Sequence, residues 1–244
     1  MPTLTLLVLI FLVALVYASV GHGGASGYLA TMSLLAYAPA AMASSALLLN
    51  LLVAGTACLT FWRAGHGSWQ WLWPFLIGSV PGALLGGWLP VSSPTYGWLL
   101  AVALLIAAVR LCLPSIPRAE ALARPRRFIA VCIGVGIGLI SGMVGVGGGI
   151  FLSPLMMLLR WADPKQTAAA SAGFIVVNSA AGLAGRFMAG RFLTGPPAWL
   201  VVAAFAGGAV GSRLGASHFS GLWLRRLLAA VLVVASGKVA VAHG

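Results

Sequence analysis

Two glycine clusters hold the residues best suited to binding chemistry. Each cluster interrupts an apolar stretch, and the first lies 124 positions before the second. Their glycines are Gly21, Gly23 and Gly24 in the first cluster, and Gly145, Gly147, Gly148 and Gly149 in the second. Glycine costs about 1 kcal/mol relative to alanine inside a helix, so such a cluster breaks the helix. A break exposes backbone N–H groups and the positive end of the next helix, which predicts anion binding.

Three polar side chains near the clusters could add hydrogen-bond donors to an anion. Asn50 and Asn178 lie 128 positions apart, each in the middle of an apolar segment, and Ser26 follows the first cluster. We expect the two amides and the hydroxyl to contact the anion. The alternative for each asparagine is a helix-bridging hydrogen bond that only stabilises the bundle, worth about 1 kcal/mol.

His22 is the only titratable side chain within either cluster, and Val146 stands at its place in the second cluster. An ordinary imidazole changes charge at about pH 6.5. His22 could therefore carry a proton or become a cationic partner of the anion, and we expect it to tune the pH dependence. The alternative is a neutral imidazole hydrogen-bonded to a carbonyl that the break has freed.

The composition places these segments in a lipid bilayer. Hydrophobic residues make up 61% of the chain and charged residues 7%, which would leave a soluble protein too little polar surface. Fourteen Lys and Arg face two acidic residues, but the cations lie at the ends of apolar segments and form no basic stripe. This argues against nucleic-acid binding. The three cysteines have no metal-ligand spacing, and we expect no cofactor and no metal.

The apolar segments recur in the same order in two halves of the chain. We expect a first repeat at 1–113, a basic cytoplasmic linker at 114–127, and a second repeat at 128–244. Each repeat would hold a hairpin broken at its glycines and three transmembrane helices. The expected helices are 3–18, 28–37, 40–62, 69–89 and 96–113, then 128–141, 150–160, 166–189, 197–216 and 222–241. The fold class is an all-α, multi-pass membrane protein with two homologous halves.

A glycine ladder with a spacing of four residues supports the duplication. Gly78, Gly82 and Gly86 recur 129 positions later as Gly207, Gly211 and Gly215. The offset between corresponding residues grows from 124 at the clusters to 128 at the asparagines. The second half must therefore carry extra residues between these two features, and we place them in the turn at 164–171. The ladder itself predicts close helix packing.

The distribution of cations favours inverted repeats. If each half begins with a hairpin and then crosses three times, eleven of the fourteen cations are cytoplasmic and only Arg186, Arg191 and Lys238 are not. Parallel repeats would place nine inside and five outside. The inverted arrangement satisfies the positive-inside rule better and is common in secondary transporters. It would bring the two glycine clusters toward the membrane midplane from opposite faces.

The paired G-x-G-G motifs, the Ala/Ser-rich helix after a proline and the closing glycine ladder resemble the sulfite exporter TauE/SafE family of bacterial inner-membrane transporters. The resemblance covers residues 4–239. It implies a secondary transporter, working as an exporter, of sulfite or related organosulfonate anions in the inner membrane. The partners would be the small sulfur-containing anion and the lipid bilayer, and the sequence is compatible with a homo-oligomer.

An intramembrane serine protease of the rhomboid type is the alternative function. Ser26 lies in a literal G-x-S-G motif, and His218 could act as its base. However, Ile150 stands at the place of Ser26 in the second repeat while the glycines persist. The feature shared by the two halves is therefore the glycine backbone and not a nucleophile, and we expect a transporter and not an enzyme.

Overall fold

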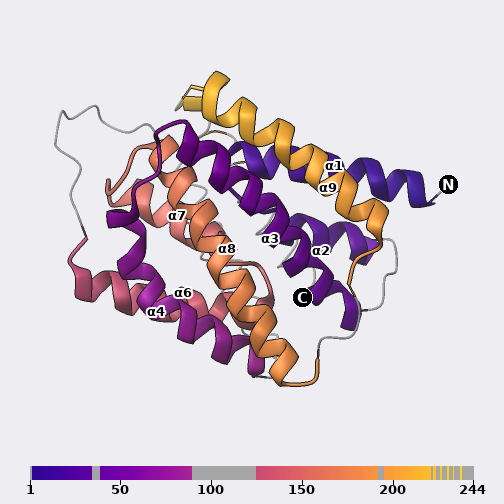
Figure 1. The fold of residues 1–244 in the computed structure, drawn as a ribbon, viewed down its shortest axis with the longest axis horizontal. Helices are drawn as coiled ribbons and strands as arrows, with labels where there is room; N and C mark the ends of the chain where they lie inside the picture. Colours follow the sequence, from indigo (N-terminus) through magenta and orange to yellow (C-terminus); the bar gives the residue numbers. More distant parts are fainter. Residues whose placement is uncertain are drawn as a thin grey trace.

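The fold is a bundle of helices in which the two halves of the chain are intermingled (Figure 1). The computed structural model describes residues 2–34, 39–89, 125–191 and 195–220, with six further positions between 222 and 237. The regular structure of these residues is helical. The helices of the first half are α1 (Pro2–Ser19), α2 (Ala25–Leu34), α3 (Pro39–Arg63) and α4 (Trp69–Trp88). Those of the second half are α6 (Arg127–Val144), α7 (Gly149–Leu158), α8 (Pro164–Met188), α9 (Ala198–Arg213) and the π-helix η1 (Leu214–His218).

These helices confirm the all-helical class and most of the expected boundaries. Both glycine clusters fall between helices, as their cost inside a helix predicts. Asp163 caps α8, because its carboxylate accepts the backbone N–H groups of Lys165 and Gln166 at 2.8 and 2.9 Å. The expected helix 96–113, most of the expected helix 222–241 and linker residues 114–124 lie outside the described residues.

Within the described residues, four helices are long and apolar enough to cross a membrane. Their spans are Ser44–Arg63, Arg127–Val144, Pro164–Met188 and Ala198–His218. Leu4–Ser19 and Gly149–Leu158 are shorter apolar helices. This set supports a multi-pass membrane protein.

The helix bounds correct our placement of the insertion between the repeats. α2 and α7 both have 10 residues and begin 124 positions apart, while α3 and α8 both have 25 residues and begin 125 apart. The offset reaches 129 only at α4 and α9. The extra residues therefore lie between α8 and α9, at 189–197, and not at 164–171. With this alignment the counterpart of Asn50 is Ile175, and Asn178 corresponds to Val53.

Each glycine ladder packs against the first helix of the other half. Along α4, a Cβ on Gly78, Gly82 or Gly86 would overlap carbonyl oxygens of α6. Along α9 and η1, a Cβ on Gly207, Gly211 or Gly215 would overlap carbonyl oxygens of α1. Absent side chains thus let the backbones approach closely, as expected for such ladders. Figure 1 shows both pairs, α1 beside α9 and α4 beside α6.

The register of these contacts gives the helix directions. Gly78 meets Val131 and Gly86 meets Leu139, so α4 and α6 run in parallel. The same reasoning makes α9 parallel to α1, since Gly207 meets Phe11 and Gly215 meets Ser19.

The central pair, α3 and α8, runs antiparallel. The Trp62 indole N–H donates to the Ala169 carbonyl at 3.2 Å, near the end of α3 and the beginning of α8. Gly182, late in α8, lies near Leu47, early in α3. α4 runs parallel to α8, because Leu72 lies at Gly173 and Trp88 at Gly185.

α9 runs parallel to α3, because Gly208 lies at Val53 and the Ser212 and Thr60 hydroxyls are 3.2 Å apart. The three pairs of corresponding helices, α1 and α6, α3 and α8, α4 and α9, therefore run in opposite directions.

We predict that two glycines of α6 differ sharply when replaced by alanine. A Cβ on Gly138 would overlap the Ser79 carbonyl of α4, whereas a Cβ on Gly136 meets nothing within 4 Å. Gly138→Ala should lower the thermal unfolding temperature of the detergent-purified protein by several degrees. Gly136→Ala should leave it unchanged or raise it, because alanine is favoured by about 1 kcal/mol in a helix. Equal effects of the two substitutions would contradict the close packing of α4 on α6.

Candidate functional site

The two helix breaks end their preceding helices in the same way. In the first break the His22 N–H donates to the Tyr17 carbonyl at 2.8 Å, and in the second the Val146 N–H donates to the Ser141 carbonyl at 3.3 Å. Both donor and acceptor are 124 positions apart between the breaks. The chain then turns through glycines with positive φ, which are Gly21 and Gly24 in the first break and Gly145, Gly147 and Gly148 in the second.

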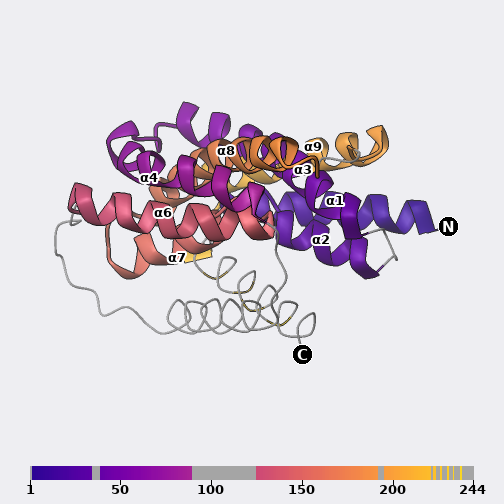
Figure 2. The ribbon, with the colours of Figure 1, turned by 90° about the horizontal axis from the view of Figure 1, so that it is seen from below.

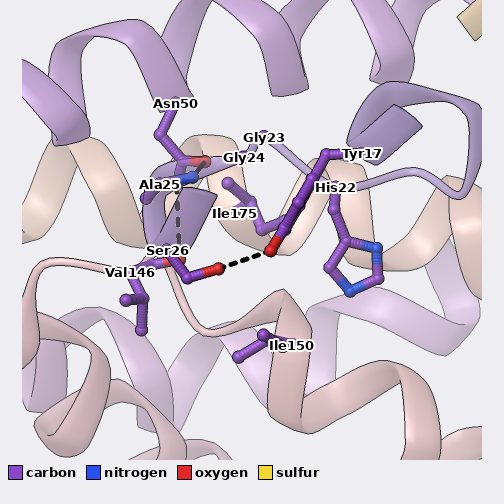
Figure 3. Close-up of a pocket in the computed structure, with 10 residues that line it drawn as sticks. All are labelled: Tyr17, His22, Gly23, Gly24, Ala25, Ser26, Asn50, Val146, Ile150 and Ile175. Carbon is purple, nitrogen blue, oxygen red and sulfur yellow. Dashed lines mark hydrogen bonds between the residues drawn. The ribbon is translucent and has the colours of Figure 1, made fainter. Parts of the chain in front are cut away.

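The two breaks meet at a small pocket inside the bundle (Figure 3). The empty volume at this pocket is about 200 Å³, which includes space open to the surroundings. Its lining comes from both halves: Tyr17, His22, Gly23, Gly24, Ala25, Ser26 and Asn50 from the first, and Val146, Ile150 and Ile175 from the second. Segments more than 120 positions apart in sequence thus form one site, as the paired clusters predict.

Asn50 links the two breaks through its carboxamide. Its Oδ1 accepts the N–H of Ala25, the first residue of α2, at 3.2 Å. Its Nδ2 lies 3.4 Å from the Val146 carbonyl in the second break and donates to the Ser179 hydroxyl of α8 at 3.0 Å. The side chain is 1% exposed. One buried, neutral group therefore satisfies polar atoms from the beginning of α2, the second break and α8.

Two of the predicted glycines make room for this carboxamide. A Cβ on Gly23 would overlap Asn50 Oδ1, and a Cβ on Gly147 would overlap Asn50 Nδ2. Gly147 also has a φ of +76°, which side chains rarely adopt. The glycines are thus needed both for the turn and for the approach of Asn50.

The two halves line the pocket with residues of different chemistry. His22, Ser26 and Asn50 line it from the first half, and their counterparts Val146, Ile150 and Ile175 line it from the second. The last of these equivalences is visible in the contacts. Asn50 lies against Gly23 and Ala25, and Ile175 lies against Gly147 and Gly149, which are the corresponding positions. At these three corresponding positions the first half therefore supplies polar side chains and the second half apolar ones.

His22 is turned toward the protein interior and is 2% exposed. Its Nδ1 lies 3.1 Å from the Val20 carbonyl, and its Nε2 lies 3.3 Å from the Ser153 hydroxyl of α7. Since a carbonyl can only accept, Nδ1 carries a proton and Nε2 can accept from Ser153. Ser153 in turn lies 2.5 Å from the Ser171 hydroxyl of α8. This arrangement satisfies a neutral imidazole beside a freed carbonyl, one of the two interpretations of the sequence.

Ser26 and His218 show no protease geometry. The Ser26 hydroxyl is 2.9 Å from the Tyr17 hydroxyl (Figure 3). His218 lies at the end of η1, is exposed, and contacts the Ser217 hydroxyl at 2.7 Å through Nδ1. These contacts give no support to the nucleophile and base of the alternative function.

The remaining predicted site residues lie around the pocket and not in its lining. Gly21 packs on the Ala168 backbone, Gly148 on Phe174 and Gly149 on Ile175, while Gly145 ends α6. Asn178 is also outside the lining. Its Nδ2 donates to the Phe174 carbonyl within α8 at 2.8 Å, and its buried Oδ1 has no hydrogen-bond partner.

Arg186 and Arg191 bind helix ends and not the pocket. Arg186 donates to the Met143 carbonyl at the end of α6 at 3.1 Å, and Arg191 donates to the Leu89 carbonyl just after α4 at 2.9 Å. Cations favourably satisfy the free carbonyls at helix C-termini. We therefore assign both arginines a capping role.

Three side chains of the site were missed by the sequence reasoning. Ile175 was missed because the insertion was placed before α8 instead of after it, which shifted the alignment by three residues. Ser179, the partner of Asn50, and Tyr17, the partner of Ser26, carry no spacing signal that would have singled them out.

Comparison with known proteins now gives the family. The model of the family "Sulfite exporter TauE/SafE" matches residues 6–239, nearly the whole chain. The chain belongs to the TauE/SafE family. It is also 34% identical over 233 residues to a protein of Sinorhizobium fredii (strain NBRC 101917 / NGR234) described as "Probable membrane transporter protein y4hK", with 94% of each chain covered. No solved structure matches the chain. Membership of this family of membrane transporters confirms the resemblance seen in the motifs.

We predict that Gly147→Ala abolishes or strongly reduces transport. An alanine at this position would have to adopt a positive φ, and its Cβ would overlap Asn50 Nδ2. Gly65→Ala is the matched control, because Gly65 has a φ of +82° and open space around it. Transport by both variants should be compared at equal amounts of folded protein in liposomes. Loss in both would attribute the effect to backbone strain, and loss in neither would contradict the role of Gly147 at the site.

We also predict that Asn50→Ala weakens anion binding more than Asn178→Ala. The first change removes a group that touches both breaks, whereas Asn178 lies outside the pocket lining and donates within its own helix. Losing a hydrogen bond to a charged ligand costs about 1.5–3 kcal/mol, or more than tenfold in affinity. Titration of the purified variants with sulfite would measure this. Equal affinities of the two variants for sulfite would show that Asn50 contributes no more to anion binding than Asn178 does.

Proposed function

We propose that this protein is a secondary transporter, working as an exporter, that moves sulfite or a related organosulfonate anion across the bacterial inner membrane. The observation that carries the proposal is the meeting of the two helix breaks at one pocket between the repeats. The pocket offers a helix N-terminus, an amide and hydroxyl groups without a full positive charge in its lining, unless His22 is protonated. Such groups bind an anion without a large cost of burying ions in the bilayer.

Asn50 marks the place for the anion in this pocket. Its Oδ1 occupies the N–H of Ala25 at the positive end of α2. An oxygen of a sulfite or sulfonate group would bind there more strongly, because hydrogen bonds to charged groups are about twice as strong as those between neutral groups. When the anion displaces Oδ1, the carboxamide can rotate and turn its Nδ2 toward the anion. This would free the Val146 carbonyl and the Ser179 hydroxyl on the opposite side of the pocket.

This exchange links anion binding to the contact between the halves. Asn50 is one link between the first break and the second, so its rotation would weaken the contact of the breaks across the pocket. Opening of either side could then follow, as alternating access requires. Both ring nitrogens of His22 have neutral partners. We therefore assign the driving force for transport to the anion's own charge and the membrane potential, and not to a proton carried by His22.

The two halves would be inverted repeats in the membrane. Support comes from the opposite directions of the three corresponding helix pairs and from the positions of the cations. Arg63, Lys165 and Arg213 lie at one end of the bundle, where the Lys165 ammonium donates to the Ala216 carbonyl at 2.9 Å. Arg186 and Arg191 lie at the opposite end of α8. The first end would be cytoplasmic by the positive-inside rule.

Counterflow in proteoliposomes tests the function. Liposomes loaded with unlabelled sulfite should accumulate external radiolabelled sulfite when they contain the full chain, and Gly147→Ala liposomes should not. Sulfate, thiosulfate and simple sulfonates would be added as competitors. If neither sulfite nor any of these other anions supported counterflow, the proposed function would be refuted.

Single-cysteine labelling tests the orientation. After removal of Cys58, Cys112 and Cys132, a cysteine at position 165 should react in spheroplasts only with a membrane-permeant reagent, and a cysteine at position 191 with an impermeant one. Reaction of position 165 with the impermeant reagent would overturn the inverted arrangement that we propose.

A further inference from the structure

Three buried side chains on α4, α6 and α8 present oxygen atoms that have no hydrogen-bond partner within the described part of the chain. They are Ser79, Ser141 and Asn178, and each is at most 1% exposed. The atoms are the two hydroxyl oxygens and Asn178 Oδ1. Oδ1 is the unpaired end of the carboxamide, because Nδ2 donates to the Phe174 carbonyl, which can only accept. Buried polar atoms need a partner, and a bound water or ion is a common one.

The packing of α4 and α8 brings Ser79 and Asn178 to the same level of the bundle. A Cβ on Gly182 of α8 would lie 3.6 Å from Gly142 of α6 and 3.9 Å from the Ala83 carbonyl of α4. Asn178 precedes Gly182 by four residues, and Ser79 precedes Ala83 by four, so each lies on the same helix face one turn earlier. Since the three helices run in parallel, the two residues form the next layer. The distances at Gly182 leave room for a group of the size of a methyl.

Ser141 borders this layer from α6. A Cβ on Gly148 would lie 3.3 Å from Ser141 Cβ and 2.8 Å from the Phe174 ring. Phe174 is one turn before Asn178 on α8, and its carbonyl accepts the Asn178 amide. Ser79 packs on the backbone of α6 one turn before Ser141. The three side chains therefore lie where α4, α6 and α8 meet.

The corresponding residues of the other repeat support this placement. Gly208 corresponds to Ser79 at the offset of α4 and α9, and Val53 corresponds to Asn178 at the offset of α3 and α8. A Cβ on Gly208 would lie 3.0 Å from Val53 Cγ1, so these two positions are neighbours. One has no side chain and the other is apolar. The oxygen atoms of Ser79 and Asn178 are therefore a feature of one repeat only.

The chemistry of the cluster suits a small cation. A carboxamide oxygen repels an anion, whereas oxygen atoms are the ligands that hard cations prefer. Ser141 lies in the last turn of α6, at the negative end of the helix dipole. The three side chains are uncharged, and Asp163, the acidic residue of the described part of the chain, caps α8 instead. The charge of a divalent ion would stay uncompensated there, which favours a monovalent one.

We propose that Ser79, Ser141 and Asn178 bind a small monovalent cation such as Na⁺, at a site separate from the anion pocket. The cation would fix α8 against α4 and α6. Ser179, the next residue of α8, accepts the Asn50 amide at 3.0 Å. The bound cation thus stabilises the position of α8 in which the two breaks are linked. This inference goes beyond the proposed function, because it concerns another site and another ligand.

Thermal unfolding of the detergent-purified full chain tests the site without a transport measurement. Sodium chloride and potassium chloride would each replace N-methyl-D-glucamine chloride at constant ionic strength. The unfolding temperature should rise by several degrees and saturate with at least one of the two alkali ions, because a ligand that binds only the folded state stabilises it.

Variants of the three residues assign the effect to this site. Ser79→Ala, Ser141→Ala and Asn178→Leu should each remove or strongly weaken the dependence on the alkali ion. Without that ion, Asn178→Leu should unfold at the same temperature as wild type or higher, because it removes an unpaired buried oxygen. Ser212→Ala is the matched control. Its buried hydroxyl lies on α9, has partners at Thr60 and Ala209, and should not matter for the alkali-ion effect.

The outcomes separate this inference from the proposed function. Equal unfolding temperatures of the wild-type protein in all three salts would overturn the inference and leave the oxygen atoms to water. An alkali-ion effect that persists in all the folded variants of the three residues would overturn it as well. Because three independent variants are used, failure of one to fold leaves the test intact. Sulfite counterflow is measured separately, so the loss of either proposal leaves the other standing.

Discussion

The structure depends on one constraint, which is that every backbone polar group inside a bilayer needs a partner within the protein. A helix break violates it locally, because the N–H groups at the beginning of the next helix lose their intrahelical acceptors. Here the Asn50 carboxamide supplies an acceptor to α2 and a donor to the second break. In the function that we propose, the same need for a partner is what an anion would satisfy at this place. The proposed binding chemistry would then follow from how the protein tolerates its own broken helices.

The glycine ladders hold the breaks in position. Since α4 packs on α6 and α9 packs on α1, the first helix of each half is held by the last described helix of the other half. Figure 2 shows the resulting layered bundle, with α1 and α2 beneath α3 and α9. This exchange couples the halves through backbone contacts that lipid cannot replace.

Helix positions were predictable from the sequence because they follow from local costs. The glycine clusters had to lie between helices, and Asp163 before Pro164 had to cap α8. Side-chain partners were less predictable, since they depend on how distant helices cross. The offset between Asn50 and Asn178 indicated an equivalence that the helix bounds do not support, because an offset does not say where an insertion lies. The equivalence of Ile175 with Asn50 emerged only from the helix bounds.

The central claim is that the anion binds at the first N–H of α2, between the two breaks. Diffraction from crystals of the protein grown with selenite, a heavier analogue of sulfite, tests this claim most directly through the anomalous signal of selenium. The account predicts a single strong peak in the pocket, with selenite oxygens within about 2.7–3.2 Å of the Ala25 nitrogen and Asn50 Oδ1 moved away from it. A selenium peak elsewhere, with Asn50 still bound to Ala25 and Ser179, would contradict it.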